Sequence, residues 1–226
     1  MISVIIPTLN EEDNIERCIR GIKKEDAGCE IIVADGGSTD RTVEIAGADE
    51  GIKVIRTGKG RGLQMNEGAA AAAGEILLFL HADTRLEEGW SSALLPSLKD
   101  RSVAGGAFTF KVDSPERHYR LIESWVSLRC SIFKLPYGDQ GIFVRRDVFE
   151  CIGGYREIPL MEDVDIIERV RKAGRIAILD KKAFTHHRRW AKQGWVRASL
   201  MNQMIMLLYR LGGSPDRLAK IYYRER

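Results

Sequence analysis

The chain has 226 residues, of which 44% are hydrophobic and 30% are charged. This length fits one globular domain with a substantial buried core, and the composition excludes an intrinsically disordered chain. The net charge of +3 hides an asymmetry, because residues 181–226 contain 11 Lys or Arg and only 2 Asp or Glu. A basic end on an acidic body points to an anionic partner (phosphate, a lipid headgroup or nucleic acid), unless it is simply a solvated basic surface.

The cysteines and the two ends of the chain indicate the cellular compartment that is expected for the protein. Cysteines stand at positions 18, 29, 130 and 151 without a C-x-x-C pair, so we expect reduced core residues of an intracellular protein, not disulfides or zinc ligands. The first residues, MISVIIPTLNEE, have no basic n-region, which predicts that there is no signal peptide. The longest uncharged stretch near the C-terminus, Ala198–Tyr209, has 12 residues, well short of the roughly 20 that a spanning helix needs.

The first eighty residues predict an alternation of strands and helices. Short apolar runs rich in β-branched residues predict buried strands at Ile2–Ile6, Glu30–Ala34, Lys53–Thr57 and Ile76–Leu80. The helices predicted between them are one with an apolar stripe at Ile15, Cys18, Ile19 and Ile22, one from about Thr39, and an alanine-rich one ending near Ala73. Such repeats with short connections form a parallel sheet covered by helices on both faces.

Ligands of such sheets bind beyond the carboxyl ends of the strands. This rule places four polar segments along one edge: Pro7–Glu11, Asp35, Gly58–Arg61 and His81–Asp83. The second half of the sequence is less regular. It predicts a strand at Gly105–Val112, a helix at Glu116–Phe133, a turn and short strand at GDQGIFVRR, a helix at Glu162–Ala173 with Val164, Ile167 and Val170 inward, and a final helix at Gly194–Leu211.

Six segments in order resemble the family 2 glycosyltransferases of the GT-A fold: VIIPTLNEEDNI, IIVADGGSTDRT, MNEGAAAAAGE, ILLFLHADT, GDQGIFVRRDVFECIGGYRE and LMEDVDIIERVRKAG. The resemblance runs from Ser3 to about Leu179, and the tail HHRRWAKQGWVRASLMNQ is similar to a small bacterial subgroup. It implies an α/β fold of the nucleotide-diphospho-sugar transferase type, with a mostly parallel central sheet, helices on both faces and a helical C-terminal extension.

The resemblance implies a donor site at the ends of the first two strands. Pro7, Thr8 and Glu11 match the family's loop against base and ribose. Asp35 matches an aspartate that hydrogen-bonds the nucleotide base, as a carboxylate can by accepting an N–H. The family usually has a second aspartate beside it, where this chain has Gly36. The alternative for Asp35 is a turn or helix-capping acid.

The stretch HADT resembles the family's acid-X-acid motif, with His81 and Ala82 before the surviving Asp83. Asp83 matches the ligand that holds Mg²⁺ or Mn²⁺ on the diphosphate, and one carboxylate can suffice because such cations also bind substrate phosphates and water. His81 either donates a hydrogen bond near ribose or sugar, or caps the strand without a ligand role. One of His186 and His187 would complete the metal shell, since adjacent side chains on a strand face opposite ways.

Two basic segments are further candidates for diphosphate binding. Lys59 and Arg61 lie in the loop GKGRG, where backbone amides and a helix N-terminus could meet phosphate, and the alternative is a solvated basic loop. Arg188 and Arg189, followed by Trp190, faintly resemble the arginine–tryptophan motif of processive family members. An arginine pair could bind diphosphate bidentately, and the alternative is a basic surface.

The resemblance implies that Asp163 is the general base, which accepts the proton of an acceptor hydroxyl as its oxygen attacks the anomeric carbon. One base opposite a metal-bound leaving group gives a single displacement with inversion. Glu162 beside it would orient neighbouring loops. The alternative is a helix that simply starts with two acids, which its dipole favours. Gly138, Asp139 and Gln140 match the loop between donor sugar and acceptor, where Asp139 and Gln140 would bind hydroxyls.

The chain is expected to divide into a glycosyltransferase domain, residues 1–190, and a basic amphipathic helical extension, residues 191–226. The helix from Gly194 is apolar well beyond a single face. It either packs on the domain, pairs with a second copy as a homodimer, or lies on a membrane surface with its basic residues near anionic lipid, namely Arg197, Arg210, Arg217 and Lys220.

The function implied is an inverting glycosyltransferase that moves a sugar from a nucleotide-diphosphate-sugar to an acceptor hydroxyl or lipid phosphate. Its expected location is the cytoplasm, at the inner face of the membrane if the last helix binds lipid, and no nucleic-acid partner is expected. A nucleotidyltransferase on this fold would carry G-x-G-T-R-x after the first strand, where this chain has PTLNEE. A non-catalytic nucleotide-sugar binding module fits the missing first acid, but Asp163 argues against it.

Overall fold

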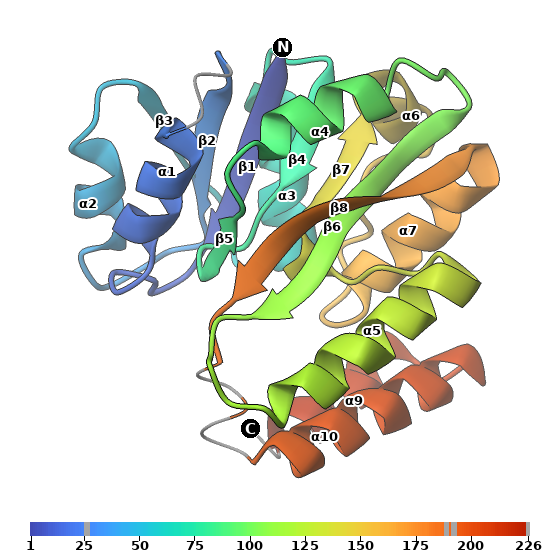
Figure 1. Cartoon of the computed structure of the whole chain (residues 1–226). Helices are drawn as coiled ribbons and strands as arrows, with labels where there is room; N and C mark the ends of the chain where they lie inside the picture. Colours follow the sequence, from blue (N-terminus) through green and yellow to red (C-terminus); the bar gives the residue numbers. More distant parts are fainter. Residues whose placement is uncertain (25–27, 188–189, 191–193, 225–226) are drawn as a thin grey trace.

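The computed structural model describes residues 1–24, 28–187, 190 and 194–224, and within them the strands form one eight-stranded sheet in the order β3-β2-β1-β4-β7-β6-β8-β5 (Figure 1). The strands are β1 (Ile2–Thr8), β2 (Glu30–Asp35), β3 (Ile52–Arg56), β4 (Ile76–Phe79), β5 (Thr84–Leu86), β6 (Val103–Val112), β7 (Ile142–Arg145) and β8 (Arg175–Thr185). The helices are α1 (Ile15–Lys23), α2 (Thr42–Gly47), α3 (Arg61–Ala71), α4 (Trp90–Ser97), α5 (Tyr119–Phe133), α6 (Arg146–Cys151), α7 (Glu162–Ala173), α9 (Trp195–Arg210) and α10 (Pro215–Arg224), with a 3₁₀ turn, η1, at Gly138–Gln140.

The first four strands form the predicted parallel half of the sheet. β1 lies between β2 and β4 and is buried along its whole length, as expected for a central strand with both faces covered. Thr8 pairs with Asp35 at the carboxyl ends of β1 and β2, so the polar segments that follow these strands begin at one edge of the sheet.

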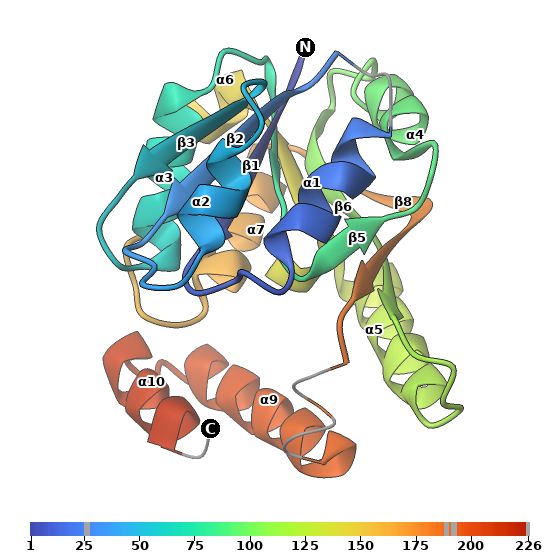
Figure 2. The same cartoon turned by 90° about the vertical axis from the view of Figure 1, so that its left-hand side faces the viewer.

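Two hydrophobic clusters fill the two faces of the sheet, and helices cover both (Figure 2). Ile2, Val4 and Ile6 point into the cluster under α1, α2 and α4, whereas Ile5 points into the cluster under α3, α6 and α7. This alternation is the period of two that a strand imposes. The predicted stripe of α1 is confirmed, because Ile15, Cys18, Ile19 and Ile22 are all buried.

The second half of the sheet reverses direction. β7 is antiparallel to both β4 and β6, while β8 runs parallel to β6 and antiparallel to the short β5. Gly106 allows the close β6–β8 approach, because an added Cβ would lie 2.0 Å from the carbonyl oxygen of Ala177. The β5–β8 ladder brings the chain after β4 beside the chain after β8.

The C-terminal helices lie below the carboxyl edge of the sheet (Figure 2). Ile205 and Met206 of α9 and Leu218 of α10 belong to the same core cluster as α7, so these helices pack on the rest of the protein. The prediction that the helix from Gly194 is the last one is wrong, because α10 follows it after a turn at Gly212. No helix in the described part of the chain is both long and apolar enough to span a membrane.

All four cysteines are free thiols. Cys18 and Cys130 are buried, but Cys29 is only half-buried and Cys151 is exposed, so the expectation of four core cysteines is wrong for these two. Cys151 ends the short helix α6, which the sequence analysis did not predict.

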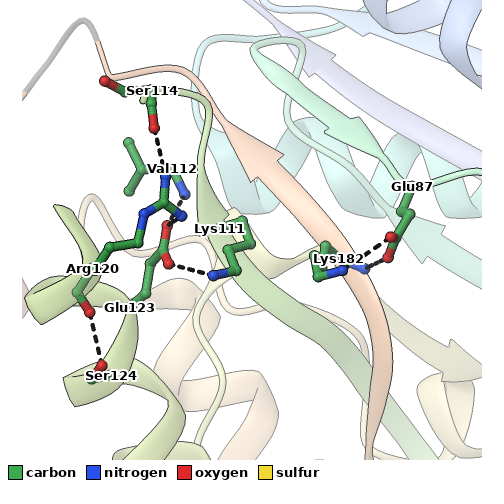
Figure 3. A network of polar contacts seen from close by, with 8 residues as sticks. All are labelled: Glu87, Lys111, Val112, Ser114, Arg120, Glu123, Ser124 and Lys182. Carbon is green, nitrogen blue, oxygen red and sulfur yellow. Dashed lines mark hydrogen bonds and ion pairs between the residues drawn. The ribbon is translucent and has the colours of Figure 1, made fainter. Parts of the chain in front are cut away.

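A buried carboxylate fastens α5 to the sheet (Figure 3). Glu123 accepts hydrogen bonds from Lys111 Nζ at 2.5 Å, from an Arg120 guanidinium nitrogen at 2.6 Å and from the Val112 backbone N–H at 3.1 Å. Glu123 is the single acidic residue of α5, and its negative charge is paired inside the protein with Lys111 and Arg120.

Replacing Glu123 by alanine is expected to lower the free energy of unfolding by about 2 kcal/mol, because the buried N–H of Val112 loses its acceptor and two cations lose their partner. Urea unfolding would measure the change. The control is Glu116→Ala, at an exposed acid just before the same helix, for which a change within about 0.5 kcal/mol is expected. Equal losses for the two variants would contradict the anchoring role of Glu123.

Candidate active site

Two adjoining cavities hollow the carboxyl edge of the sheet. The larger, with a volume of about 800 Å³, lies beside the loop after β1 (hereafter the β1 cavity). The smaller, of about 440 Å³, lies at the start of α7 (hereafter the α7 cavity). Both are lined by Arg61, His81, Asp83 and Glu162, so these four residues stand where the cavities meet.

The β1 cavity collects most of the residues predicted to bind a donor. Its lining includes Pro7, Thr8, Glu11 and Ala82, together with the two cations of the GKGRG loop. Gln64 also lines it and was not predicted, although it is a polar residue on the buried face of α3.

Gln64 ties α3 to the ends of β1 and β2. Its side-chain N–H₂ donates to the carbonyl oxygens of Thr8 at 2.7 Å and Ala34 at 2.8 Å. An added Cβ at Gly36 would lie 3.0 Å from this amide, so the residue that stands in place of the family's second aspartate leaves room for Gln64. Gly36 and Gln64 are distant in the sequence, so their close contact becomes apparent only in the folded chain.

Asp35 is not part of the lining of the β1 cavity. Asp35 is 2% exposed, and its carboxylate accepts hydrogen bonds from the N–H groups of Gly37 and Ser38 at 3.0 Å, and from the hydroxyls of Ser38 and Thr8. The predicted contact with a nucleotide base would compete with these bonds for the lone pairs of Asp35. The arrangement instead fits the alternative, a turn acid that fixes the loop after β2.

Asp83 and His186 meet at the end of the β5–β8 ladder. The N–H of His186 donates to the carbonyl oxygen of Asp83 at 3.2 Å, next to the pair Thr84–Thr185, and both side chains line the α7 cavity. His187 is not part of this lining, and its ring nitrogen is 3.1 Å from the carbonyl oxygen of Asp113.

The expectation that His186 and His187 face opposite ways is wrong, because β8 ends before them at Thr185. Their rings are instead stacked, with centroids 4.9 Å apart and planes 10° apart. His186 is therefore the histidine that the structure places on the cavity.

The donors at this point fit a hard divalent cation that takes its other ligands from a substrate. No group of three or more His, Cys, Asp or Glu residues arranged for a metal occurs among the residues described. The carboxylate of Asp83 and the imidazole of His186 are two donors on one cavity wall. Mg²⁺ in particular binds through one or two carboxylates together with substrate phosphates and water, so the carboxylate of Asp83 can suffice.

His81 is a neutral imidazole at pH 7. Burial, followed by the positive charge of Arg61, lowers the pKa of His81 to about 4, although the carboxylates of Asp83 and Asp163 act in the opposite direction. An added Cβ at Gly138 would lie 3.1 Å from His81 Nε2 and 3.4 Å from Asp163 Cβ. The ring of His81 and the side chain of Asp163 are thus neighbours on either side of a glycine.

Asp163 is held by backbone groups from two segments. One carboxylate oxygen accepts the N–H of Gly138 at 2.8 Å, and the other accepts the N–H of Val164 at 2.8 Å. The residue before α7, Met161, has φ +70°, a left-handed conformation that costs a non-glycine residue about 1 kcal/mol or more. This strained turn presents the first residues of α7 to the α7 cavity.

Glu162 is the buried member of the acid pair. It is 6% exposed, and its carboxylate lies 3.8 Å from a guanidinium nitrogen of Arg61. Burial, followed by the charge of Asp163, raises the pKa of Glu162 to about 7, while Arg61 acts to lower it. The site can therefore hold a proton on Glu162 near neutral pH.

Glu162→Gln is expected to stabilise the protein at pH 8 but not at pH 5. The pKa of Glu162 is raised on folding, so its contribution to stability is full below pH 4.5 and is lost as the pH rises through 7. Glutamine stays neutral throughout, so the advantage of the variant should grow across this window by on the order of 2 kcal/mol. Urea unfolding at both pH values measures it, and a difference that does not change with pH would contradict the assignment.

The residues of loop 138–140 lie in different environments: Asp139 lines the α7 cavity and Gln140 is buried in the interior. Asp139 lines the α7 cavity, and its carbonyl oxygen accepts the hydroxyl of Thr185 at 3.0 Å. Gln140 is 1% exposed; its N–H₂ donates to the carbonyl of Phe108 at 3.0 Å and its oxygen accepts the N–H of Tyr137 at 3.1 Å. The expectation that Gln140 binds sugar hydroxyls does not fit this arrangement, because its amide is used inside the protein.

The far wall of the α7 cavity comes from the C-terminal helices. Asn202 of α9 and Tyr222 of α10 contribute polar groups that were not predicted, and Trp190 is buried beside them. Asn202 could have been recognised in the sequence as a polar residue within an otherwise apolar helix. The predicted arginine pair Arg188 and Arg189 lies outside the described residues.

Known proteins are similar to this chain in sequence and in fold. The profile of glycosyl transferase family 2 matches residues 3–156. A PGL/p-HBAD biosynthesis glycosyltransferase of Mycobacterium bovis is 33% identical over 162 residues, which are 69% of this chain and 63% of that protein. The present chain therefore spans less than two thirds of the length of that relative.

Solved structures agree on the architecture. TarS of S. aureus superposes with a TM-score of 0.65 at 19% identity, over 81% of this chain and 36% of that one. Glucosyl-3-phosphoglycerate synthase from Mycobacterium tuberculosis, solved with Mn²⁺, UDP and glucosyl-3-phosphoglycerate, gives 0.60 at 23% identity, over 94% and 80%. The fold and the cavities at its sheet edge define a protein of the GT-A type. With the profile covering most of its length, the chain belongs to glycosyl transferase family 2.

Proposed function

We propose that this protein is an inverting glycosyltransferase that moves a sugar from a nucleotide-diphosphate-sugar to an acceptor hydroxyl or lipid phosphate. One observation carries the proposal. Asp83 from the first half of the chain and Asp163 from the second half line the same α7 cavity. A site for this reaction needs a group at the leaving diphosphate and a base at the acceptor, and these carboxylates supply both.

Asp163 is the general base. Its carboxylate is fixed by the N–H groups of Gly138 and Val164, so it is oriented before an acceptor arrives. Each carboxylate oxygen keeps a lone pair with which to accept the acceptor's proton. As the acceptor oxygen forms its bond to the anomeric carbon, the bond to the diphosphate breaks and the proton passes to Asp163. This single displacement inverts the anomeric carbon.

The nucleotide lies in the β1 cavity and the sugar in the α7 cavity. Arg61, His81 and Asp83 stand where a diphosphate would join the two parts, and the base Asp163, which lines only the α7 cavity, assigns the sugar to that side. Arg61 supplies positive charge, and neutral His81 donates a hydrogen bond without adding charge. Gln64 and Asp35 hold the β1 and β2 loops in place.

Asp83 and His186 would hold Mg²⁺ or Mn²⁺ on the diphosphate. When bound, the cation stabilises the negative charge that develops on the leaving group. Support for Mn²⁺ and a UDP-type donor comes from the mycobacterial synthase, whose structure contains both Mn²⁺ and UDP.

The proposal is tested by measuring release of free nucleoside diphosphate from a panel of UDP- and GDP-sugars, with Mn²⁺ and with EDTA. One donor is expected to be turned over, and EDTA is expected to lower its rate by at least about tenfold. Tight binding of a donor without any turnover, in the presence of candidate acceptors, would favour a nucleotide-sugar binding module instead.

A further inference from the structure

Helices α5 and α9 run side by side in the same direction (Figure 1). Near their N-termini, the rings of His118 and Trp195 stack with centroids 5.4 Å apart. Near their C-termini, the guanidinium of Arg210 lies 5.8 Å from the ring centroid of Phe133. Their inner faces share one hydrophobic cluster, so the two helices form a single unit.

Each helix also carries an exposed apolar stripe on the face opposite its buried one. On α5 the stripe is Leu121, Trp125, Leu128 and Ile132, each between 51% and 64% exposed. On α9 it is Val196, Leu200, Met204, Leu207 and Leu211, each between 41% and 75% exposed. These residues recur every three or four positions, which is the spacing of one helix face. Exposed stripes of this size on neighbouring helices indicate a binding surface.

The charged residues of α5, α9 and α10 are mostly basic, and the exposed acid Glu116 lies just before α5. Residues 117–134 contain four Lys or Arg and one acid, Glu123, which is buried and bound to Lys111 and Arg120. Residues 194–224 contain five Lys or Arg and one acid, Asp216, which lines the β1 cavity. Neither acid belongs to the apolar stripes.

We propose that the α5 and α9 stripes dock on an anionic lipid bilayer. Pairing with a second copy would bring two basic surfaces together, and their like charges would oppose it. An anionic bilayer satisfies both features, since it takes up the apolar side chains at the headgroup boundary and attracts the Arg and Lys around them. Trp125 is a residue type that favours this boundary.

The docking surface is separate from the candidate active site. Ile205 and Met206, on the opposite face of α9 from its stripe, line the α7 cavity. A bilayer on the outer face would therefore leave this lining untouched. The proposal does not depend on the proposed function, because binding to lipid can be measured without any sugar donor.

The test is flotation with vesicles of phosphatidylcholine alone and with about 30% phosphatidylglycerol added. The wild-type protein is expected to bind the anionic vesicles at least about tenfold more than the neutral ones, and to lose most of this binding in about 0.5 M NaCl. The double variant Leu128→Gln/Leu207→Gln should reduce binding to anionic vesicles about tenfold. The matched control is Leu95→Gln, at an exposed leucine of α4, which should bind as the wild type does.

Three outcomes would overturn the proposal. One is the absence of any preference for anionic vesicles. Another is binding to anionic vesicles that the double variant leaves unchanged. Charge alone would then explain the binding, and an acidic protein would fit the surface equally well. The third is a dimer in sedimentation equilibrium that the double variant dissociates, which would assign the stripes to a second copy. Thermal unfolding of each variant verifies that it is folded.

Discussion

Asp163→Asn is expected to lower the rate of nucleoside diphosphate release by about 10³-fold, with little change in the KM for the donor. The magnitude is that of losing a general base. The KM should stay unchanged because Asp163 lines the α7 cavity and not the β1 cavity, where the nucleotide is proposed to bind. Steady-state kinetics with the donor found in the panel would measure both quantities.

The asparagine variant removes the proton-accepting oxygen together with the acceptor for the N–H of Val164. Its side-chain oxygen can still accept the N–H of Gly138, which Asp163 accepts at 2.8 Å, so the loop should stay in place. The control Asp180→Asn removes one carboxylate from an exposed position on β8 and should leave the rate unchanged. Turnover by Asp163→Asn within about threefold of the wild type would remove Asp163 from the role of base.

Asp83→Asn is expected to lower turnover by about 10²-fold at saturating Mn²⁺ and to raise the Mn²⁺ concentration needed for half-maximal rate. An amide oxygen is a weaker ligand than a carboxylate for a hard cation, so the charge on the leaving diphosphate would be less well stabilised. A titration of the rate with Mn²⁺ gives both values.

The two stacked histidines offer a matched pair of controls for this metal site. His186→Gln should also raise the Mn²⁺ requirement, because His186 lines the α7 cavity beside Asp83. His187→Gln should leave it unchanged, since the ring of His187 lies against the carbonyl of Asp113. Identical Mn²⁺ titrations for these two variants would contradict the assignment of His186 as a ligand.

The sequence was informative where a pattern repeats along the chain. The strand–helix alternation of the first eighty residues is confirmed, and so is the helix at Glu162–Ala173 with Val164, Ile167 and Val170 buried. Burial imposes a period on each of these elements, and the period can be recognised locally. The short elements β5, α4 and α6 were not predicted, because three to eight residues show too little of a period.

The site was predictable as a set of positions but not as a set of contacts. Asp83 and Asp163 were expected in one pocket and line one cavity. Asp35 and Gln140 were expected to face ligands, yet their polar groups are used by Ser38, Phe108 and other neighbours in the fold. For Asp35 a local turn was the stated alternative, whereas nothing in the local sequence reveals the tertiary hydrogen bond of Gln140 to Phe108. The same is true of the wall built by α9 and α10, which depends on how the C-terminal helices pack.

The most direct test is a crystal structure with Mn²⁺ and either UDP or GDP. The account predicts an anomalous manganese peak about 2.1 Å from a carboxylate oxygen of Asp83, with the nucleotide in the β1 cavity and Asp163 facing the far side of the terminal phosphate. A diphosphate bound away from Asp83, or one with Asp163 on the same side as the metal, would contradict it.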